Sequence, residues 1–276
     1  MKLPQVLNEK IKWETYTIEL LKENVYHIEE ENDNPSSMYC IVGSEKVLWV
    51  DLANKDPKHI EELKQIKDIL ANQKELIVMI THYHYDHVGQ LDAFKDHRIL
   101  YPKKDIRVDM DYDQRFEFIE DGYQLDLGQQ QVLEMIEVPG HTEGSMCVID
   151  KKNELVVTGD AIGSSYVWLF FIDDILNVYE KGLNHLYQTI QDFKSPLFMC
   201  GHRSQQFKSI NRDPLSPIND PMTMQYVKDM QKLVTMIKNK TALTRPYQGR
   251  GHIESDCVYY FEGSCCEIDS FISLMQ

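Results

Sequence analysis

The chain has 276 residues, 42% of them hydrophobic, so it can bury one large core or one core with an appendage. It carries 44 acidic and 29 basic residues, a formal net charge of −15. This charge, with no block of lysines, excludes a general nucleic-acid-binding surface. The start, Met1 to Pro4, lacks an apolar export segment, and no window reaches transmembrane length. We expect a cytoplasmic protein without membrane association.

The first part of the chain is predicted to form strands and one helix. Apolar and β-branched runs predict strands at 15–20, 25–29, 38–42, 46–51 and 76–80. A polar insert, Glu30 to Ser37, separates two of them. Asp56 is the predicted cap of a helix that begins at Pro57. Its expected apolar face is Ile60, Leu63, Ile66, Ile69 and Leu70.

The second half repeats the strand and helix pattern. Strands are predicted at 132–138, 146–150, 154–158, 196–200 and 257–261, and a helix at 174–193. Residues 203–220 and 241–255 are predicted loops, and Asp220 and Pro221 open a helix between them. The expected apolar face of that helix is Val227, Met230, Val234 and Ile237. We expect this helix to be core, with pairing in a homodimer as the alternative.

The most informative segment directly follows the strand 76–80. It reads His82, Tyr83, His84, Tyr85, Asp86 and His87, with Gly89 just beyond. Ligands bind in the loops at the carboxyl ends of strands in α/β units. Imidazole nitrogen with carboxylate oxygen suits zinc, iron or manganese. The segment therefore predicts a metal site, against the alternative of a polar loop that happens to be rich in histidine.

Three further candidates end other predicted strands, and each directly follows a glycine. They are His141 after Gly140, Asp160 after Gly159, and His202 after Gly201. Glycine permits the tight turn that a close approach to a ligand requires. Four strand ends with ligand chemistry indicate one shared site.

These residues resemble the metallo-β-lactamase superfamily, whose pattern is His-x-His-x-Asp-His followed by a separate His, Asp and His. The resemblance covers about residues 38 to 202. It also includes Asp51, which matches an earlier aspartate of the family and whose role would be to orient a ligating imidazole. It implies an α+β fold, a four-layer αββα sandwich with a C-terminal helical and β appendage. We expect a catalytic domain at 1–215 and an appendage at 216–276.

The resemblance also implies a ligand set and a reaction. It places His82, His84 and His141 on one ion, Asp86, His87 and His202 on a second, and Asp160 between them. The cofactors would be two divalent ions, zinc first, with iron or manganese as alternatives. They would hold a hydroxide that cleaves an ester, lactone, thioester or related bond of a small-molecule substrate. Asp86 would transfer a proton to the leaving group, and Tyr166 would assist catalysis.

Other functions remain open at this point. A phosphodiesterase and a mononuclear iron persulfide dioxygenase use similar motifs, and a regulatory protein that retains a metal site is the non-enzymatic alternative. Ordinary β-lactamases of the superfamily lack the bridging aspartate, so Asp160 counts against that activity. Glyoxalase II shares the ligand set, but its basic glutathione-binding segment is not recognisable after His202.

Several residues have simpler interpretations. Cys40, Cys147 and Cys200 lie in apolar runs and are predicted core residues, and Cys265 with Cys266 is a predicted partly buried pair. Further residues near the motif are expected to pack locally or to contact substrate; they are Tyr83, Tyr85, Trp168 and Arg203. The remaining histidines are expected to be surface or local structural residues; they are His27, His59, His97, His185 and His252.

Overall fold

The computed structural model describes residues 2–163, 167–170, 172–206, 222–246, 257–261 and 264–268. The chain forms two compact units, Met1–Met135 and Ile136–Gln276. The division falls within a strand, β10 (Val132–Glu137). The predicted domain boundary at residue 215 lies outside the described residues and stays a prediction.

The first unit contains an eight-stranded sheet whose strands follow chain order from β1 to β8. Neighbours from β1 to β5 are antiparallel, whereas β5, β6, β7 and β8 run parallel. The strands are β1 (Lys10–Lys12), β2 (Tyr16–Lys22), β3 (Val25–Glu30), β4 (Ser37–Val42), β5 (Lys46–Val50), β6 (Glu75–Met79), β7 (Arg98–Pro102) and β8 (Phe116–Ile119).

The main helix of this unit, α1 (Ile60–Ala71), packs against β4 and β5. A 3-10 turn, η1 (Pro57–His59), precedes it, and Asp56 accepts a hydrogen bond from the Lys58 N–H, as the predicted cap requires. Ile69 is 42% exposed, so its place on the predicted buried face is wrong. The shorter helices are α2 (Tyr85–Val88), η2 (Leu91–Phe94) and η3 (Lys103–Asp105).

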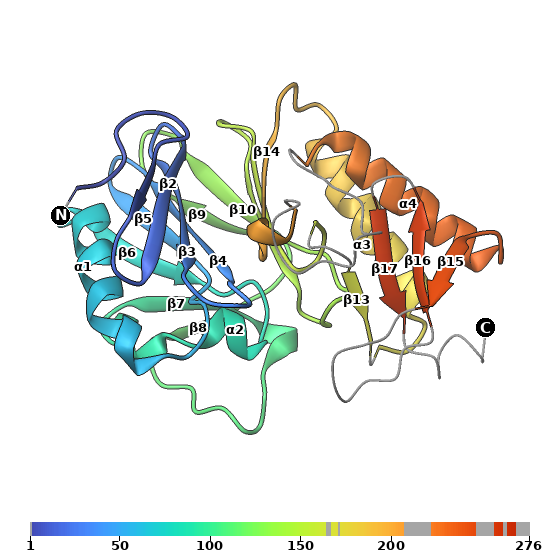
Figure 1. Ribbon diagram of the computed structural model, residues 1–276, viewed down its shortest axis with the longest axis horizontal. Helices are drawn as coiled ribbons and strands as arrows, with labels where there is room; N and C mark the ends of the chain where they lie inside the picture. Colours follow the sequence, from blue (N-terminus) through green and yellow to red (C-terminus); the bar gives the residue numbers. More distant parts are fainter. Residues whose placement is uncertain are drawn as a thin grey trace. The chain divides into compact units, whose positions relative to one another are not determined.

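A five-stranded sheet has the order β14, β12, β11, β10, β9. Its remaining strands are β9 (Tyr123–Asp126), β11 (Met146–Asp150), β12 (Leu155–Gly159) and β14 (Leu197–Cys200). In the second unit, α3 (Ile175–Ile190) packs against α4 (Met224–Lys238) (Figure 1). Helix α4 also covers a four-stranded sheet of β13 (Val167–Leu169), β17 (Ser264–Ile268), β16 (Cys257–Phe261) and β15 (Leu243–Pro246). These elements share one buried core, so the described C-terminal segments pack as part of the second unit.

The structure corrects the sequence prediction at short elements. Residues 241–255 were predicted to be loop, but they contain β15, whose four residues pair antiparallel with β16. A strand that short, ending in Pro246, has too few residues for a pattern, and only its partner reveals it. Helix α3 begins after Asp174, which has φ +53, and the predicted apolar face of α4 packs inward. Asp220 and Pro221 lie outside the described residues.

No helix in the described ranges combines the length and the hydropathy that crossing a bilayer demands. The expected cytoplasmic location stays a prediction.

Candidate metal centre

The histidine-rich segment leaves the end of β6, the buried strand between β5 and β7. Because β5 and β6 are parallel, their carboxyl ends meet at one edge of the sheet. The Asp51 N–H donates to the Met79 carbonyl at 2.9 Å, which extends this pairing by one residue. Asp51, just beyond the end of β5, and Thr81, two residues beyond the end of β6, are thus brought side by side.

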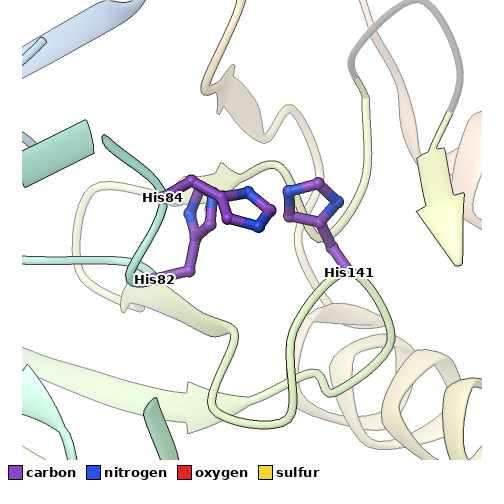
Figure 2. A group of neighbouring side chains, drawn as sticks. All are labelled: His82, His84 and His141. Atoms are coloured by element: carbon purple, nitrogen blue, oxygen red, sulfur yellow. The ribbon is translucent and has the colours of Figure 1, made fainter. Parts of the chain in front are cut away.

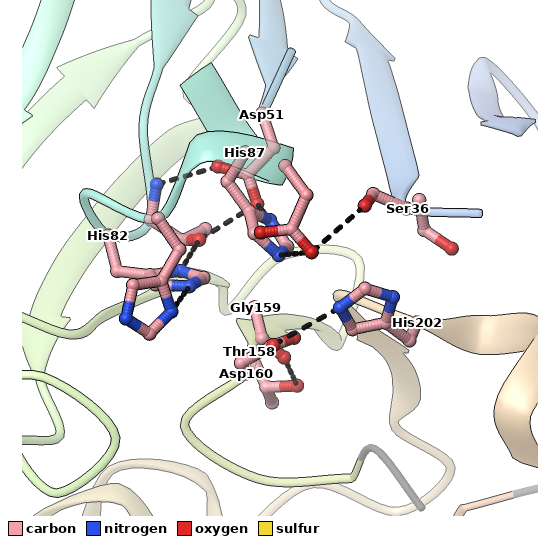
Figure 3. A network of polar contacts seen from close by, with 12 residues as sticks. Ser36, Asp51, His82, His87, Thr158, Gly159, Asp160 and His202 are labelled. Carbon is pink, nitrogen blue, oxygen red and sulfur yellow. Dashed lines mark hydrogen bonds and ion pairs between the residues drawn. The ribbon is translucent and has the colours of Figure 1, made fainter. Parts of the chain in front are cut away.

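Asp51 organises the first ligands through a buried hydrogen-bond network (Figure 3). Its carboxylate accepts from the Thr81 N–H at 2.7 Å, the Thr81 hydroxyl at 2.8 Å and His87 Nδ1 at 2.9 Å. Since the single Thr81 hydroxyl proton goes to Asp51, the Thr81 oxygen accepts from His82 Nδ1, 3.0 Å away. Both imidazoles are therefore protonated at Nδ1, and Nε2 is the nitrogen that can ligate a metal.

His82 and His84 meet edge to face at the start of this loop (Figure 2). His82 Nε2 lies 3.1 Å from His84 Nδ1. Two nitrogens each about 2.1 Å from one tetrahedral zinc would be separated by roughly 3.4 Å. The observed separation is close to what a shared ion requires.

Asp86 and His87 are the second and third residues of the short helix α2, and both are buried. Asp86 Oδ2 lies 3.9 Å from His87 Nε2. The hydroxyl of Ser36 donates to Asp86 Oδ2 at 3.4 Å. Residues 82 to 87 thus present nitrogen and oxygen donors within a few ångströms, all from the first unit.

In the second unit, His141 follows β10 in a loop packed on α3. A Cβ at Gly140 would lie 2.3 Å from the Tyr179 ring, so only glycine fits there. The Tyr179 hydroxyl donates to the Ala161 carbonyl at 2.8 Å, beside Asp160. Tyr179 therefore supports both ligand loops. His141 Nδ1 donates to the Trp168 carbonyl at 3.2 Å, which leaves Nε2 as the ligating nitrogen.

Asp160 and His202 follow two parallel neighbouring strands, β12 and β14. The Gly201 N–H donates to the Gly159 carbonyl at 2.8 Å and holds the two strand ends together. Asp160 Oδ2 lies 3.3 Å from His202 Nε2 (Figure 3). The same oxygen lies 3.6 Å from His141 Nε2. One carboxylate oxygen therefore lies between two imidazoles.

Cys200 lies next to this second group but does not extend it. Burial, with the nearby Asp160 carboxylate, raises the pKa of the Cys200 thiol to about 12. A protonated thiol is a poor ligand. The predictions for Cys40, Cys147 and Cys200 are confirmed, since each is buried and forms no disulfide.

The predicted ligands thus form two half-sites, His82, His84, Asp86 and His87 in the first unit and His141, Asp160 and His202 in the second. Tyr166 lies outside the described residues. Tyr85 is 73% exposed, whereas Tyr83 packs against the first core. Sequence reasoning missed Ser36, Thr81 and Tyr179 as supporting residues. Only the place of Thr81, directly before His82, offered a signal in the sequence.

The donor chemistry of both half-sites fits a divalent metal ion. His82, His87 and His141 each donate the Nδ1–H to a protein oxygen, and metal-ligating histidines almost always donate the ring nitrogen that does not bind the ion. The donors of His82 and His84, and those of Asp86 and His87, lie within 4.8 Å of one another. Nitrogen with carboxylate oxygen, and no thiolate, suits zinc, iron or manganese.

Comparison with known proteins identifies the family. Residues 33–202 match the metallo-beta-lactamase superfamily, and because this is more than half of the sequence, the chain belongs to that superfamily. A solved metallo-beta-lactamase from Pontibacter korlensis has a TM-score of 0.60 at 15% identity, over 80% of this chain and 99% of that one. At this identity the likeness shows the fold alone. The predicted α+β metallo-β-lactamase fold and the assignment to an enzyme superfamily are confirmed.

Three curated relatives are similar to this chain at identities below 30%. The chain is 28% identical to the Beta-lactamase-like protein 2 homolog of Caenorhabditis elegans, over 67% of this chain and 63% of that protein. It is 24% identical to human acyl-coenzyme A thioesterase MBLAC2, over 61% and 75%. It is also 24% identical to the hydroxyacylglutathione hydrolase of Psychromonas ingrahamii, over 76% and 77%. The chain spans less than two thirds of the Caenorhabditis elegans relative.

Proposed function

We propose that the chain is a dinuclear metallohydrolase that cleaves small acyl substrates. The two half-sites would bind one pair of divalent ions, zinc first. His82, His84 and His141 would hold one ion, Asp86, His87 and His202 the other, and Asp160 would bridge them. The observation that carries the proposal is the position of Asp160 Oδ2 between His141 Nε2 and His202 Nε2, at 3.6 and 3.3 Å.

Divalent ions, when bound, supply a Lewis acid and lower the pKa of water towards neutral pH. The chain's own residues supply orientation and proton transfer. Asp51 and the Trp168 carbonyl fix the tautomers of His87 and His141. Asp86, oriented by the Ser36 hydroxyl, would carry the proton to the leaving group. A role of Tyr166 in catalysis stays a prediction.

Thioesters are the first substrate class that we propose. Two relatives are named as hydrolases of thioesters, one of acyl-coenzyme A and one of hydroxyacylglutathione. Trp168 is 43% exposed, its ring centroid lies 6.4 Å from that of His141, and Phe170 is 5.9 Å from Trp168. The exposed ring of Trp168, which packs against the buried Phe170, would suit the apolar part of an acyl group.

The test compares Asp160→Ala with Asp192→Ala, a control at an exposed aspartate just after α3. Metal content is measured for each protein, and turnover is measured on acyl-coenzyme A, S-acyl glutathione, lactones, aryl esters and a phosphodiester. We expect near two zinc ions per wild-type chain and thioester turnover. Asp160→Ala should stay folded, lose metal and lose at least 100-fold in kcat, whereas Asp192→Ala should behave as wild type.

Two outcomes would contradict the proposal. Unchanged turnover in Asp160→Ala would exclude a bridging role for this carboxylate. One iron per chain with oxygen consumption on a persulfide would instead establish the dioxygenase alternative.

A further inference from the structure

A buried glutamate at the end of β3 ties two loops of the first unit together. Glu30 is 2% exposed. Its Oε1 accepts from the N–H groups of Ser36 and Asn54, each at 3.3 Å, and the Asn54 side-chain amide also donates to it. One oxygen thus joins the polar insert after β3 to the segment that follows β5.

The first connection leads to Asp86. Ser36 is fully buried, and its hydroxyl donates to Asp86 Oδ2 (Figure 3). Because Glu30 holds the Ser36 backbone, it fixes where that hydroxyl lies. The orientation of the Asp86 carboxylate therefore depends on Glu30, although the two residues are 56 positions apart in the chain.

The second connection leads to the backbone of α2. The Leu52 N–H donates to the His87 carbonyl, and the Gly89 N–H donates to the Ala53 carbonyl, both at 2.9 Å. A Cβ at Gly89 would lie 2.5 Å from the Ala53 oxygen, so the two segments are in direct backbone contact. The position of Asn54 and its neighbours thus sets the position of α2.

The segment after β5 needs an anchor because its backbone is strained. Asp51 and Ala53 have φ values of +60 and +52. In this left-handed region the Cβ of a non-glycine residue crowds the following carbonyl oxygen. Such conformations persist only where the surrounding structure holds them. The hydrogen bonds from Asn54 to Glu30 supply that restraint.

We propose that Glu30 is a positioning residue for metal binding, acting through Ser36 on Asp86 and through Asn54 on His87. The inference rests on the proposed function, since it takes Asp86 and His87 to be ligands. Glu30 lies outside the ligand motif. Its hydrogen bonds go to Ser36 and Asn54, so it acts on Asp86 and His87 through these two residues.

The experiment measures metal binding rather than turnover alone. Metal-free wild type, Glu30→Ala and Glu30→Gln are titrated with Co²⁺, and the visible absorption of the bound ion reports coordination. The control is Glu62→Gln, since Glu62 Oε2 accepts its hydrogen bonds from the Thr15 N–H and hydroxyl. Glu30→Ala should bind Co²⁺ about 10- to 100-fold more weakly, with an altered spectrum.

Glu30→Gln keeps an acceptor oxygen and should recover part of the affinity, while Glu62→Gln should match wild type. With zinc bound, Glu30→Ala should lower kcat with KM within about twofold of wild type, since substrate contacts are unchanged. Should Glu30→Ala fail to fold, two milder variants test the connections separately. Ser36→Ala removes the hydroxyl that reaches Asp86, and Asn54→Ala removes the side-chain bond to Glu30 but keeps the bond from the Asn54 N–H, so each should give a smaller loss.

Wild-type Co²⁺ affinity and spectrum in folded Glu30→Ala, or in both single-connection variants, would overturn the inference. A wild-type chain that binds no Co²⁺ at all would overturn the proposed function instead, so the two failures are distinguishable.

Discussion

The two half-sites are held by different forces. In the first unit, buried carboxylates position the ligands: Asp51 bonds Thr81 and His87, and Glu30 bonds the loops that contact Asp86 and His87. In the second unit, packing and backbone bonds dominate. Gly140 lies against the Tyr179 ring, and the Gly201 N–H bonds the Gly159 carbonyl.

Because of this difference, substitutions should destabilise the two half-sites in different ways. A carboxylate that accepts several buried donors is costly to remove, because each donor loses its partner. A packed contact is disrupted when a substitution makes two side chains clash. A second substitution that makes the neighbouring side chain smaller can therefore restore stability.

The largest effect is expected from Asp51→Ala. Asp51 is 2% exposed, and the variant would lose the three hydrogen bonds that its carboxylate accepts. At about 1 kcal/mol or more for each unsatisfied donor, the free energy of unfolding should fall by roughly 3 kcal/mol or more. Denaturant titration of the metal-free protein measures it. Asp51→Asn retains an acceptor and should lose less; equal losses in both variants would show that the carboxylate is not what matters.

Gly140→Ala should have an intermediate effect. The new Cβ would meet the Tyr179 ring at 2.3 Å, and overpacking of this kind costs about 1–3 kcal/mol. The variant should also bind metal more weakly, since His141 is the next residue. Adding Tyr179→Leu to Gly140→Ala should relieve the clash, so the double variant should be more stable than the sum of the single losses predicts. Strict additivity would contradict a steric cause.

The smallest effect concerns pH. Burial and the neighbouring Lys67 ammonium lower the pKa of His97, whose Nε2 lies 2.9 Å from Lys67 Nζ. Below its ordinary pKa of about 6.5 the unfolded chain binds a proton that the folded chain resists. Stability from this residue is therefore present above about pH 6.5 and is lost as pH falls towards the lower folded pKa.

His97→Gln should remove this part of the pH dependence. Unfolding free energies are measured for wild type and variant between pH 5.0 and 7.5, and the difference between them isolates His97 from the ligand histidines. That difference should shrink on acidification. Lys67→Met should weaken the dependence in the same direction, and a difference that stays constant with pH would refute this account.

Much of the fold was predictable where the local sequence pattern is strong. The strand before the histidine motif is a continuous apolar run, and helix α1 with its Asp56 cap and helix α3 have periodic apolar faces. The structure has all three within a few residues. Three short strands were not predicted, namely β7, β8 and β15, which have four or five residues each. Whether such segments form strands depends on pairing with a neighbouring strand rather than on local sequence.

The sequence by itself determined the ligand types and the superfamily, because metal chemistry restricts which side chains can serve and the motif keeps them close in order. Tertiary structure alone decided what holds those side chains. Glu30 with Asn54, and Tyr179 with Gly140, lie 24 and 39 positions apart, and neither pair has a periodic or motif signal. Contacts of this kind depend on how strands and helices pack, which local residue patterns do not encode.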